Sequence, residues 1–186
     1  MPALSLHKPA TYQDLFGLPP NLVGEIVRGI LHTHPRPAPK HARSSSALGG
    51  KLHPSFDDNS SGPGGWWILD EPELHLDNDI LVPNLAGWRR EQMPRLPEAA
   101  WFELAPDWVC AVLSPGTMRF DRIEKMPIYA ASGVKHIWLI DPELRILEAF
   151  ANHDSRWTLI ATHADQEQIR VPPFAAVAID LGGLWA

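Results

Sequence analysis

The chain has 186 residues, 45% of them hydrophobic, and its 16 Lys and Arg against 22 Asp and Glu give a formal net charge of -6. This length supports one substantial core, so we expect one domain over residues 1–186, with residues 1–10 as a flexible N-terminus. The acidic balance argues against non-specific coating of nucleic acid. No apolar run approaches the roughly 18 residues of a membrane-spanning helix, and the N-terminus lacks a secretory apolar stretch, which favours a cytoplasmic location.

Cysteine usage narrows the possible chemistry further. Cys110 is the only cysteine, so one chain can form neither an internal disulfide nor a cysteine-based zinc site. It lies within the apolar run 108–113, where a thiol usually behaves as a small buried hydrophobe. We therefore expect Cys110 to be a core residue and not a nucleophile.

The first third of the chain alternates short elements with proline and glycine breaks. Residues 11–20 are typical of a short capped helix ended by two prolines, and residues 24–32 of two strands joined by a glycine turn. Residues 35–39 form a proline-rich extended linker. A helix is predicted over 41–52, and the Gly-, Ser- and Asn-rich residues 57–65 predict a surface loop.

The segment 28–56 carries no acidic residue. Lys and Arg side chains there would displace counterions from a phosphate backbone, which makes the segment a candidate DNA-binding surface, although a solvated helix face explains the charges equally well. His32 and His34 share one strand face but lack a third ligand, so they are a weak candidate metal pair. The DNA-binding candidates are Arg36, Lys40, Arg43 and Lys51.

The remaining two thirds predict a mixed α/β protein. The continuous apolar run 108–113 favours a central strand that is covered on both faces. A helix is expected over 119–131, with a kink or restart at Pro127. The other predicted strands are 66–70 and 73–76 with an interruption at Pro72, then 80–86, the hairpin strands 135–141 and 145–150, and the short strands 157–160, 168–171 and 176–179.

Several ordered segments resemble the signature segments of the Uma-two family, whose members are classed as restriction endonucleases. The resemblance extends from about residue 12 to the C-terminus and implies the PD-(D/E)XK nuclease fold: a mixed β-sheet core flanked by helices, with extra antiparallel strands at both ends. It also implies hydrolysis of DNA phosphodiesters that depends on Mg²⁺, with Mn²⁺ as the alternative ion. The matching segments are Gly64–Leu74, Leu81–Trp88, Pro106–Pro115, Asp121–Ala130 and Trp138–Pro142.

The resemblance also assigns site positions, two of which depart from the family pattern. The segment matching 82–86 reads Val-Pro-Asp-Leu-Ala in the family, and the one matching 109–115 reads Val-Val-Glu-Val-Leu-Ser-Pro. Here the two acids are replaced by Asn84 and Ala111. The resemblance places the catalytic lysine at Lys125 and an auxiliary acid at Glu25.

Elementary chemistry explains why these replacements matter. Mg²⁺ retains several waters and needs about one or two protein carboxylates, while a lysine ammonium stabilises charge on the phosphate. An amide brings no charge to a metal and a methyl group cannot ligate one. Losing one such group commonly costs about 10²- to 10³-fold in rate. Strand alternation lets Ala111 face a neighbouring strand that carries Asn84, and the following helix can return Lys125 over both.

Three explanations remain open for the missing acids. The chain is a degenerate member that kept its fold, a deliberately inactivated version of an active nuclease, or a member in which another acid has moved into the site. The alternative function is a catalytically inactive DNA-binding or regulatory homodimer, with Trp66 and Trp67 as one conceivable dimer contact. The candidate replacement acids are Glu25, Asp70, Glu71, Glu73, Asp107, Asp121 and Glu124.

Without the resemblance, the site residues have ordinary interpretations. Lys125 would be expected to be an exposed helix lysine. Glu25 would be expected to pair at the surface with Arg28, three positions further on.

Overall fold

A computed structural model describes residues 8–185, and part of the predicted flexible N-terminus, residues 1–7, lies outside them. None of the helices in this range is long and apolar enough to cross a bilayer. The helices are α1 (Tyr12–Phe16), α2 (Pro39–Leu52) with a π turn at His53–Asp57, α3 (Met118–Phe120), a π turn at Asp121–Lys125, α4 (Met126–Ala131) and a 3-10 turn at Gly182–Leu184. The strands are β1 (Leu22–Val27), β2 (Ile30–Pro35), β3 (Trp66–Asp70), β4 (Leu74–Leu76), β5 (Asp79–Leu81), β6 (Leu85–Arg89), β7 (Trp108–Val112), β8 (His136–Asp141), β9 (Ile146–His153), β10 (Arg156–Ala164), β11 (Gln168–Ile169) and β12 (Ile179–Asp180).

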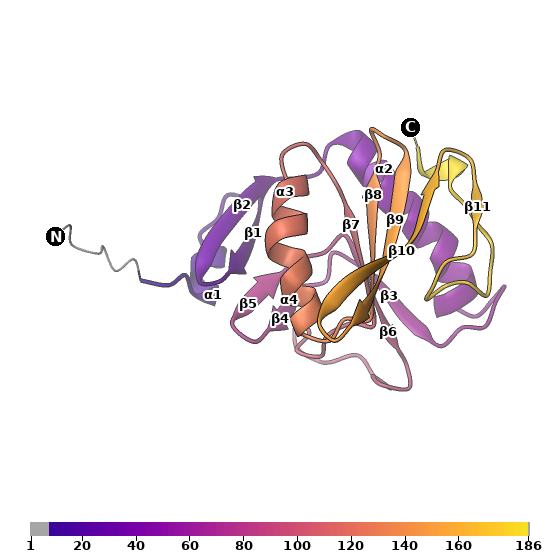
Figure 1. Cartoon of the computed structure of the whole chain (residues 1–186). Helices are drawn as coiled ribbons and strands as arrows, with labels where there is room; N and C mark the ends of the chain where they lie inside the picture. The colour runs from indigo at the N-terminus through magenta and orange to yellow at the C-terminus, as the bar shows by residue number, and fades with distance from the viewer. Residues whose placement is uncertain (1–7, 186) are drawn as a thin grey trace.

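Two larger sheets organise the molecule. The six-stranded sheet has the order β10-β9-β8-β7-β6-β3, in which only the β7–β8 pair is parallel, and the four-stranded sheet has the order β2-β1-β5-β4. Strands β11 and β12 form a separate pair. Helix α2 and the C-terminal segment cover one face of the large sheet, while the continuous helical stretch α3–α4 covers part of the other (Figure 1).

The central strand β7 divides the core into two layers. All five of its residues are buried, as the apolar run predicts. Trp108 and Cys110 face the layer under α2, whereas Val109 and Ala111 face the layer under α3–α4. Burial of the Cys110 thiol raises its pKa, which agrees with the expectation of an unreactive core residue.

The β1–β2 hairpin forms as the sequence predicts. Arg28 and Gly29 occupy its turn with positive φ angles of 51° and 74°. Two positive φ values match the right-handed twist of the flanking strands, and glycine adopts this conformation without steric cost. The hairpin places Glu25 directly opposite His32.

The strand predicted over 80–86 is wrong, because the chain changes sheets within it. Residues Asp79–Leu81 belong to the four-stranded sheet and Leu85–Arg89 to the six-stranded sheet. Pro83 has no N–H to give to a ladder, and the N–H of Val82 bonds the Glu25 carboxylate at 2.7 Å. We name Val82–Asn84 the crossover. A matching change between β3 and β4 passes through Glu71, whose φ is 44°.

The suggestion that Trp66 forms a dimer contact is also wrong. Its side chain is 2% exposed, and its ring lies 4.9 Å from that of Phe174 in the core. Trp67 is half-buried, stacks beneath the Arg90 guanidinium at 3.7 Å and donates its indole N–H to the carbonyl of Met93. Both rings are therefore used within the chain.

Candidate functional site

The crossover brings Asn84 beside Ala111. Strands β6 and β7 are antiparallel with Leu85 opposite Cys110, so extending the register by one residue sets Asn84 opposite Ala111. The Asn84 Oδ1 atom accepts the N–H of Val112 at 2.7 Å, one residue beyond Ala111 on β7. The two positions of the missing acids are therefore neighbours on adjacent strands.

Lys125 is buried and faces Glu25. Its Nζ lies 2.8 Å from Oε1 of Glu25, which is far away in sequence. The same atom lies 3.5 Å from Oδ1 of Asp121, four residues earlier in the chain. The lysine and glutamate side chains are 6% and 1% exposed. The expected surface pair of Glu25 with Arg28 is wrong, because a guanidinium nitrogen of Arg28 lies 3.0 Å from Oε2 of Glu124. The expectation that Lys125 is exposed is also wrong, because the residue is buried.

Burial and pairing act in opposite directions on these groups. Burial alone would raise the pKa of Glu25, but the ammonium of Lys125 and the hydrogen bonds from His34 and Val82 lower it overall. Burial alone would lower the pKa of Lys125, yet the Glu25 carboxylate raises it overall. The pair is therefore ionised, and each charge stabilises the other in a dry environment.

Two histidines lie close to this pair. The Nε2 atom of His34 is 3.3 Å from Glu25 Oε2, and this hydrogen bond is the main cause that raises the pKa of His34. Burial lowers the pKa of His41, whose Nδ1 atom has no hydrogen-bond partner. His32 stacks on Phe120 at 4.4 Å, so the two histidines of β2 have separate roles and do not form the predicted metal pair.

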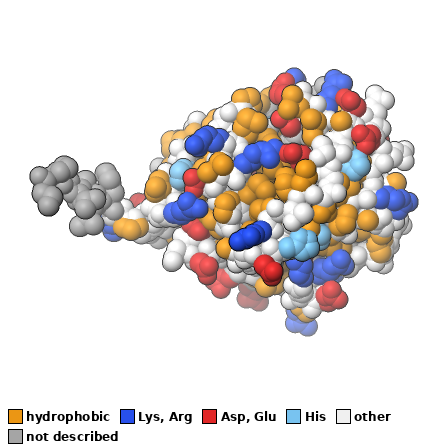
Figure 2. Space-filling view, viewed as in Figure 1, with side chains coloured by type: hydrophobic (Ala, Val, Ile, Leu, Met, Phe, Trp, Pro, Cys, Tyr) orange, Lys and Arg blue, Asp and Glu red, His pale blue; other side chains and the backbone are white. Residues whose placement is uncertain are grey.

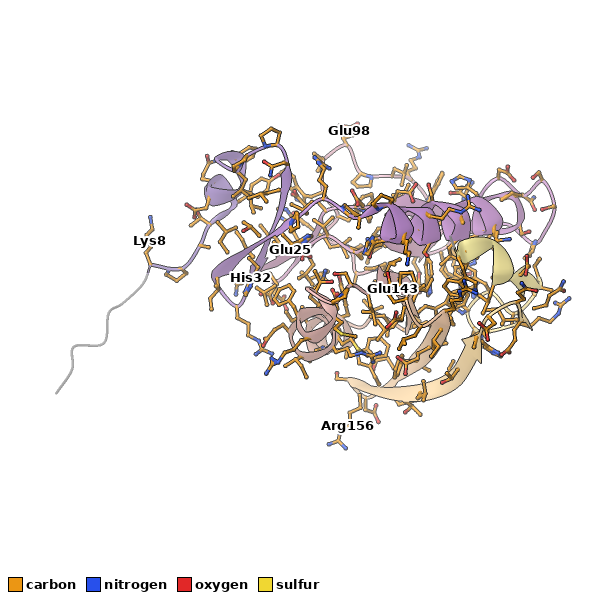
Figure 3. All side chains as sticks on the ribbon, turned by 90° about the horizontal axis from the view of Figure 1, so that it is seen from above. Lys8, Glu25, His32, Glu98, Glu143 and Arg156 are labelled. Atoms are coloured by element: carbon orange, nitrogen blue, oxygen red, sulfur yellow. The ribbon has the colours of Figure 1, made fainter. Side chains whose placement is uncertain are left out.

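A cavity of about 370 Å³ opens between the two sheets and the helices. Figure 3 shows Glu25 on the β1–β2 hairpin, on the side of the hairpin that faces the helices. Asn84 and Lys125 also line the cavity, whereas Ala111 does not, although its neighbour Val112 does. The structure therefore brings three of the four predicted site residues to one cavity, with the fourth buried beside it. Polar residues in the wall include Glu25, His34, His41, Glu71, Asn84, Ser114, Thr117, Asp121 and Lys125.

The side chains at the predicted ligand positions do not fit a divalent metal ion. The Asn84 oxygen is occupied by a backbone N–H, and Glu25 Oε1 accepts both the Val82 N–H and the Lys125 ammonium. Ala111 offers no ligand. Hard cations such as Mg²⁺ need free carboxylate oxygens, and residues 8–185 contain no group of three or more His, Cys, Asp or Glu able to hold a metal.

The seven candidate replacement acids separate into two groups. Only Glu25, Glu71 and Asp121 line the cavity, and two of these already contact Lys125. The other acids lie outside its wall. Glu73 contacts His75, Asp107 contacts Lys135 and Glu124 contacts Arg28.

The predicted DNA-binding residues are not gathered at the cavity. Arg36 lines it and donates Nε to the carbonyl of Pro20 at 3.1 Å. The others lie along α2: Lys40 is 3.2 Å from Glu143, Arg43 donates to the carbonyl of Gly183, and Lys51 is 3.7 Å from Asp180. Their positions at i, i+3 and i+11 form one stripe of the helix, which we name the α2 stripe.

Sequence reasoning missed His34 as the partner of Glu25. The usable signal was the period of two in both hairpin strands. His34 lies opposite Val23, so it is the diagonal neighbour of Glu25 on the same face. Tyr129 was also missed: its buried hydroxyl has no hydrogen-bond partner, and burial raises its pKa.

Comparison with known proteins identifies the family to which the chain belongs. The two-sheet architecture and the cavity occur in a chain whose residues 9–182 match the sequence profile of the Uma2 family, described as "Putative restriction endonuclease". The chain belongs to this family, as the resemblance predicts. No match was found among curated proteins.

A solved structure supports the same fold. A protein from Anabaena variabilis ATCC 29413, described as a "putative nuclease belonging to DUF820", aligns with a TM-score of 0.74 and 20% identity over 95% of this chain and 97% of that chain. At this identity the likeness shows the fold alone. It confirms the predicted mixed α/β sheet flanked by helices.

Proposed function

We propose that this chain is a restriction-endonuclease-like protein in which metal-dependent hydrolysis of DNA phosphodiesters is lost or severely impaired. The observation that supports the proposal is the juxtaposition of Asn84 and Ala111 beside a lysine that is already neutralised. The residues expected to supply negative charge to a Mg²⁺ or Mn²⁺ ion are an amide with an occupied oxygen and a methyl group.

The environment of Lys125 supports the same conclusion independently of the metal. An ammonium that stabilises a phosphoryl group must meet it in the transition state. Lys125 is 5% exposed and lies between the carboxylates of Glu25 and Asp121. Its charge is therefore directed to the protein interior and not to a substrate.

A plasmid-nicking assay tests this proposal. The wild-type chain is expected to leave supercoiled DNA intact with Mg²⁺ or Mn²⁺, while Asn84→Asp with Ala111→Glu restores cleavage. Because the residual rate falls about 10²- to 10³-fold for each lost group, the restored variant should exceed wild type by at least about 10²-fold. It should also gain a Mn²⁺-dependent rise in melting temperature.

The matched control is Asn84→Asp with Ala111→Gln, which has nearly the same shape at position 111 without the charge. It should remain inactive if carboxylates, and not filled space, restore the site. Cleavage by the wild-type chain would contradict impairment. A folded, Mn²⁺-binding restored variant that still fails to cleave DNA would remove the main support for a nuclease ancestry.

The α2 stripe favours a second function, DNA binding without chemistry. Three cations repeat on one helix face, and Arg36 lies at the adjacent cavity. Binding through phosphate contacts should weaken as salt rises, with a slope set by the number of contacts. Charge reversal at Arg36, Lys40 and Arg43 should abolish it.

The control for this experiment reverses three exposed cations outside α2, namely Lys8, Arg95 and Arg145. The two triple variants change the net charge equally, so a general electrostatic effect would weaken DNA binding in both. A selective loss in the first variant supports the α2 stripe. Unchanged affinity in the first variant would eliminate this function.

A further inference from the structure

Strand β10 is a long strand with one unused edge. It spans nine residues and lies at the end of the six-stranded sheet, paired with β9 alone. No other strand within residues 8–185 pairs with its second edge. Figure 3 shows β10 at the outer boundary of the molecule, with the labelled Arg156 pointing away from it. Its free backbone groups can therefore meet another chain.

The centre of the edge lacks two of the features that usually prevent such pairing. Residues 157–162 contain no charged residue and no proline, which are the devices that protect exposed edges. Leu159 and Ile160, at the centre of the strand, are 50% and 39% exposed. Hydrophobic side chains gather at the centre of the surface that carries α3–α4 and β10 (Figure 2).

A β-bulge gives this strand a symmetric pattern of faces. Before it, Leu159 lies opposite Phe150, on the face that carries α3–α4. After it, Ala161 lies opposite Ala149, on the other face. The sheet face that carries Ala161 also carries Thr158, and the opposite face carries both Trp157 and Thr162. The order of faces is therefore symmetric about the midpoint between Leu159 and Ile160.

The ends of the strand carry complementary groups. Arg156 is exposed and forms no ion pair with any described residue. His163 Nδ1 lies 2.6 Å from the carboxylate of Glu167, which is half exposed. An antiparallel pair centred between Leu159 and Ile160 sets Arg156 of each copy opposite His163 of the other, next to that carboxylate.

From these observations we propose that β10 pairs antiparallel with β10 of a second copy across a two-fold axis. Leu159 of each copy then lies opposite Ile160 of its partner, and the two large sheets join into one. Main-chain hydrogen bonds along the edge and the buried central side chains supply the affinity. A bulge discourages pairing with a flat strand, but here both strands carry the same bulge at the same point.

Sedimentation equilibrium of the full chain tests the proposal. The wild-type chain should be a dimer in the micromolar range, and Leu159→Lys should be monomeric, because it brings a charge to the centre of the joined edge. The control is Ile30→Lys, which adds the same charge at an aliphatic residue that is 60% exposed in the β1–β2 hairpin; it should remain dimeric. A monomeric wild type, or a dimeric Leu159→Lys variant, overturns the proposal.

A charge exchange tests the register. Arg156→Glu places two carboxylates together at each end of the joined edge and should raise the dimer dissociation constant about tenfold. Adding Glu167→Lys should restore most of the affinity, because the charges are then reversed on both sides. Failure of the double variant to recover would overturn the proposed register, and an unchanged Arg156→Glu variant would do the same.

Discussion

Two lysine–carboxylate pairs in this molecule have nearly the same geometry and different surroundings. Lys125 meets Glu25 at 2.8 Å, with both side chains almost fully buried. Lys135 meets Asp107 at 2.6 Å, but its side chain is 55% exposed. The two pairs therefore differ little in interatomic distance. They differ in how much water surrounds the lysine ammonium.

The comparison shows how burial changes the environment of Lys125. Water screens the charge of Lys135, and Asp107 keeps a second partner in the N–H of Arg89. Lys125 has no such screening, so its ammonium and the Glu25 carboxylate depend on each other. Lys125 and Glu25 thus form a structural pair in the interior of this chain.

The largest effect that would test this comparison is the loss of Lys125. Lys125→Met should lower the free energy of unfolding by about 3–5 kcal/mol, because it leaves a buried carboxylate uncompensated. The matched change Lys135→Met should cost less, because water screens the half-exposed ammonium and the Asp107 carboxylate keeps the N–H of Arg89. Urea denaturation measures both, and equal costs would refute the distinction.

A smaller effect is expected when both buried charges are removed together. Glu25→Leu with Lys125→Leu should cost about 1–3 kcal/mol, since the remaining penalty is the N–H of Val82 without its acceptor. The double variant should therefore be more stable than Lys125→Met. If the costs of the single changes simply add, the two groups are not coupled as described.

The smallest expected effect is the pH dependence that the neighbouring histidines contribute. The pKa of His34 is raised in the folded chain, so its stabilisation is complete below the unfolded pKa of about 6.5 and is lost as the pH rises through the folded value. The pKa of His41 is lowered, so its contribution is present above the unfolded value and is lost as the pH falls. His34→Gln should remove a decline of stability that begins as the pH rises above about 6.5, whereas His41→Gln should remove a rise of stability as the pH approaches about 6.5 from below. Melting curves across this range distinguish the two, and slopes of the same sign would contradict the assigned shifts.

Much of the fold followed from local sequence signals. Period-two patterns around Gly29 and the apolar run 108–113 identified the hairpin and the central strand, because both depend on neighbours in sequence. The crossover was not predicted, since two short strands of different sheets give one continuous apolar pattern. Only the missing N–H of Pro83 hinted at the change.

The resemblance proposed four site positions, but it could not predict the environment of their side chains. Its residues were found by resemblance to a family, and the structure places Asn84, Glu25 and Lys125 around one cavity. The burial of Lys125 could not be deduced, because helix periodicity does not reveal that a distant carboxylate completes the pair. Long-range partners of this kind, including His34 for Glu25, are set by the packing of the hairpin sheet against the helices.

The crossover shows what position 84 contributes to the architecture. The amide of Val112 ends on the Asn84 oxygen, and asparagine offers an acceptor of the same reach as aspartate. Exchanging one for the other therefore sacrifices charge while leaving the junction of the sheets closed. The methyl group of Ala111 accepts no hydrogen bond, so its side chain forms no such contact at the junction. The hydrogen bond at position 84 therefore holds the junction of the two sheets whether or not the site carries out chemistry.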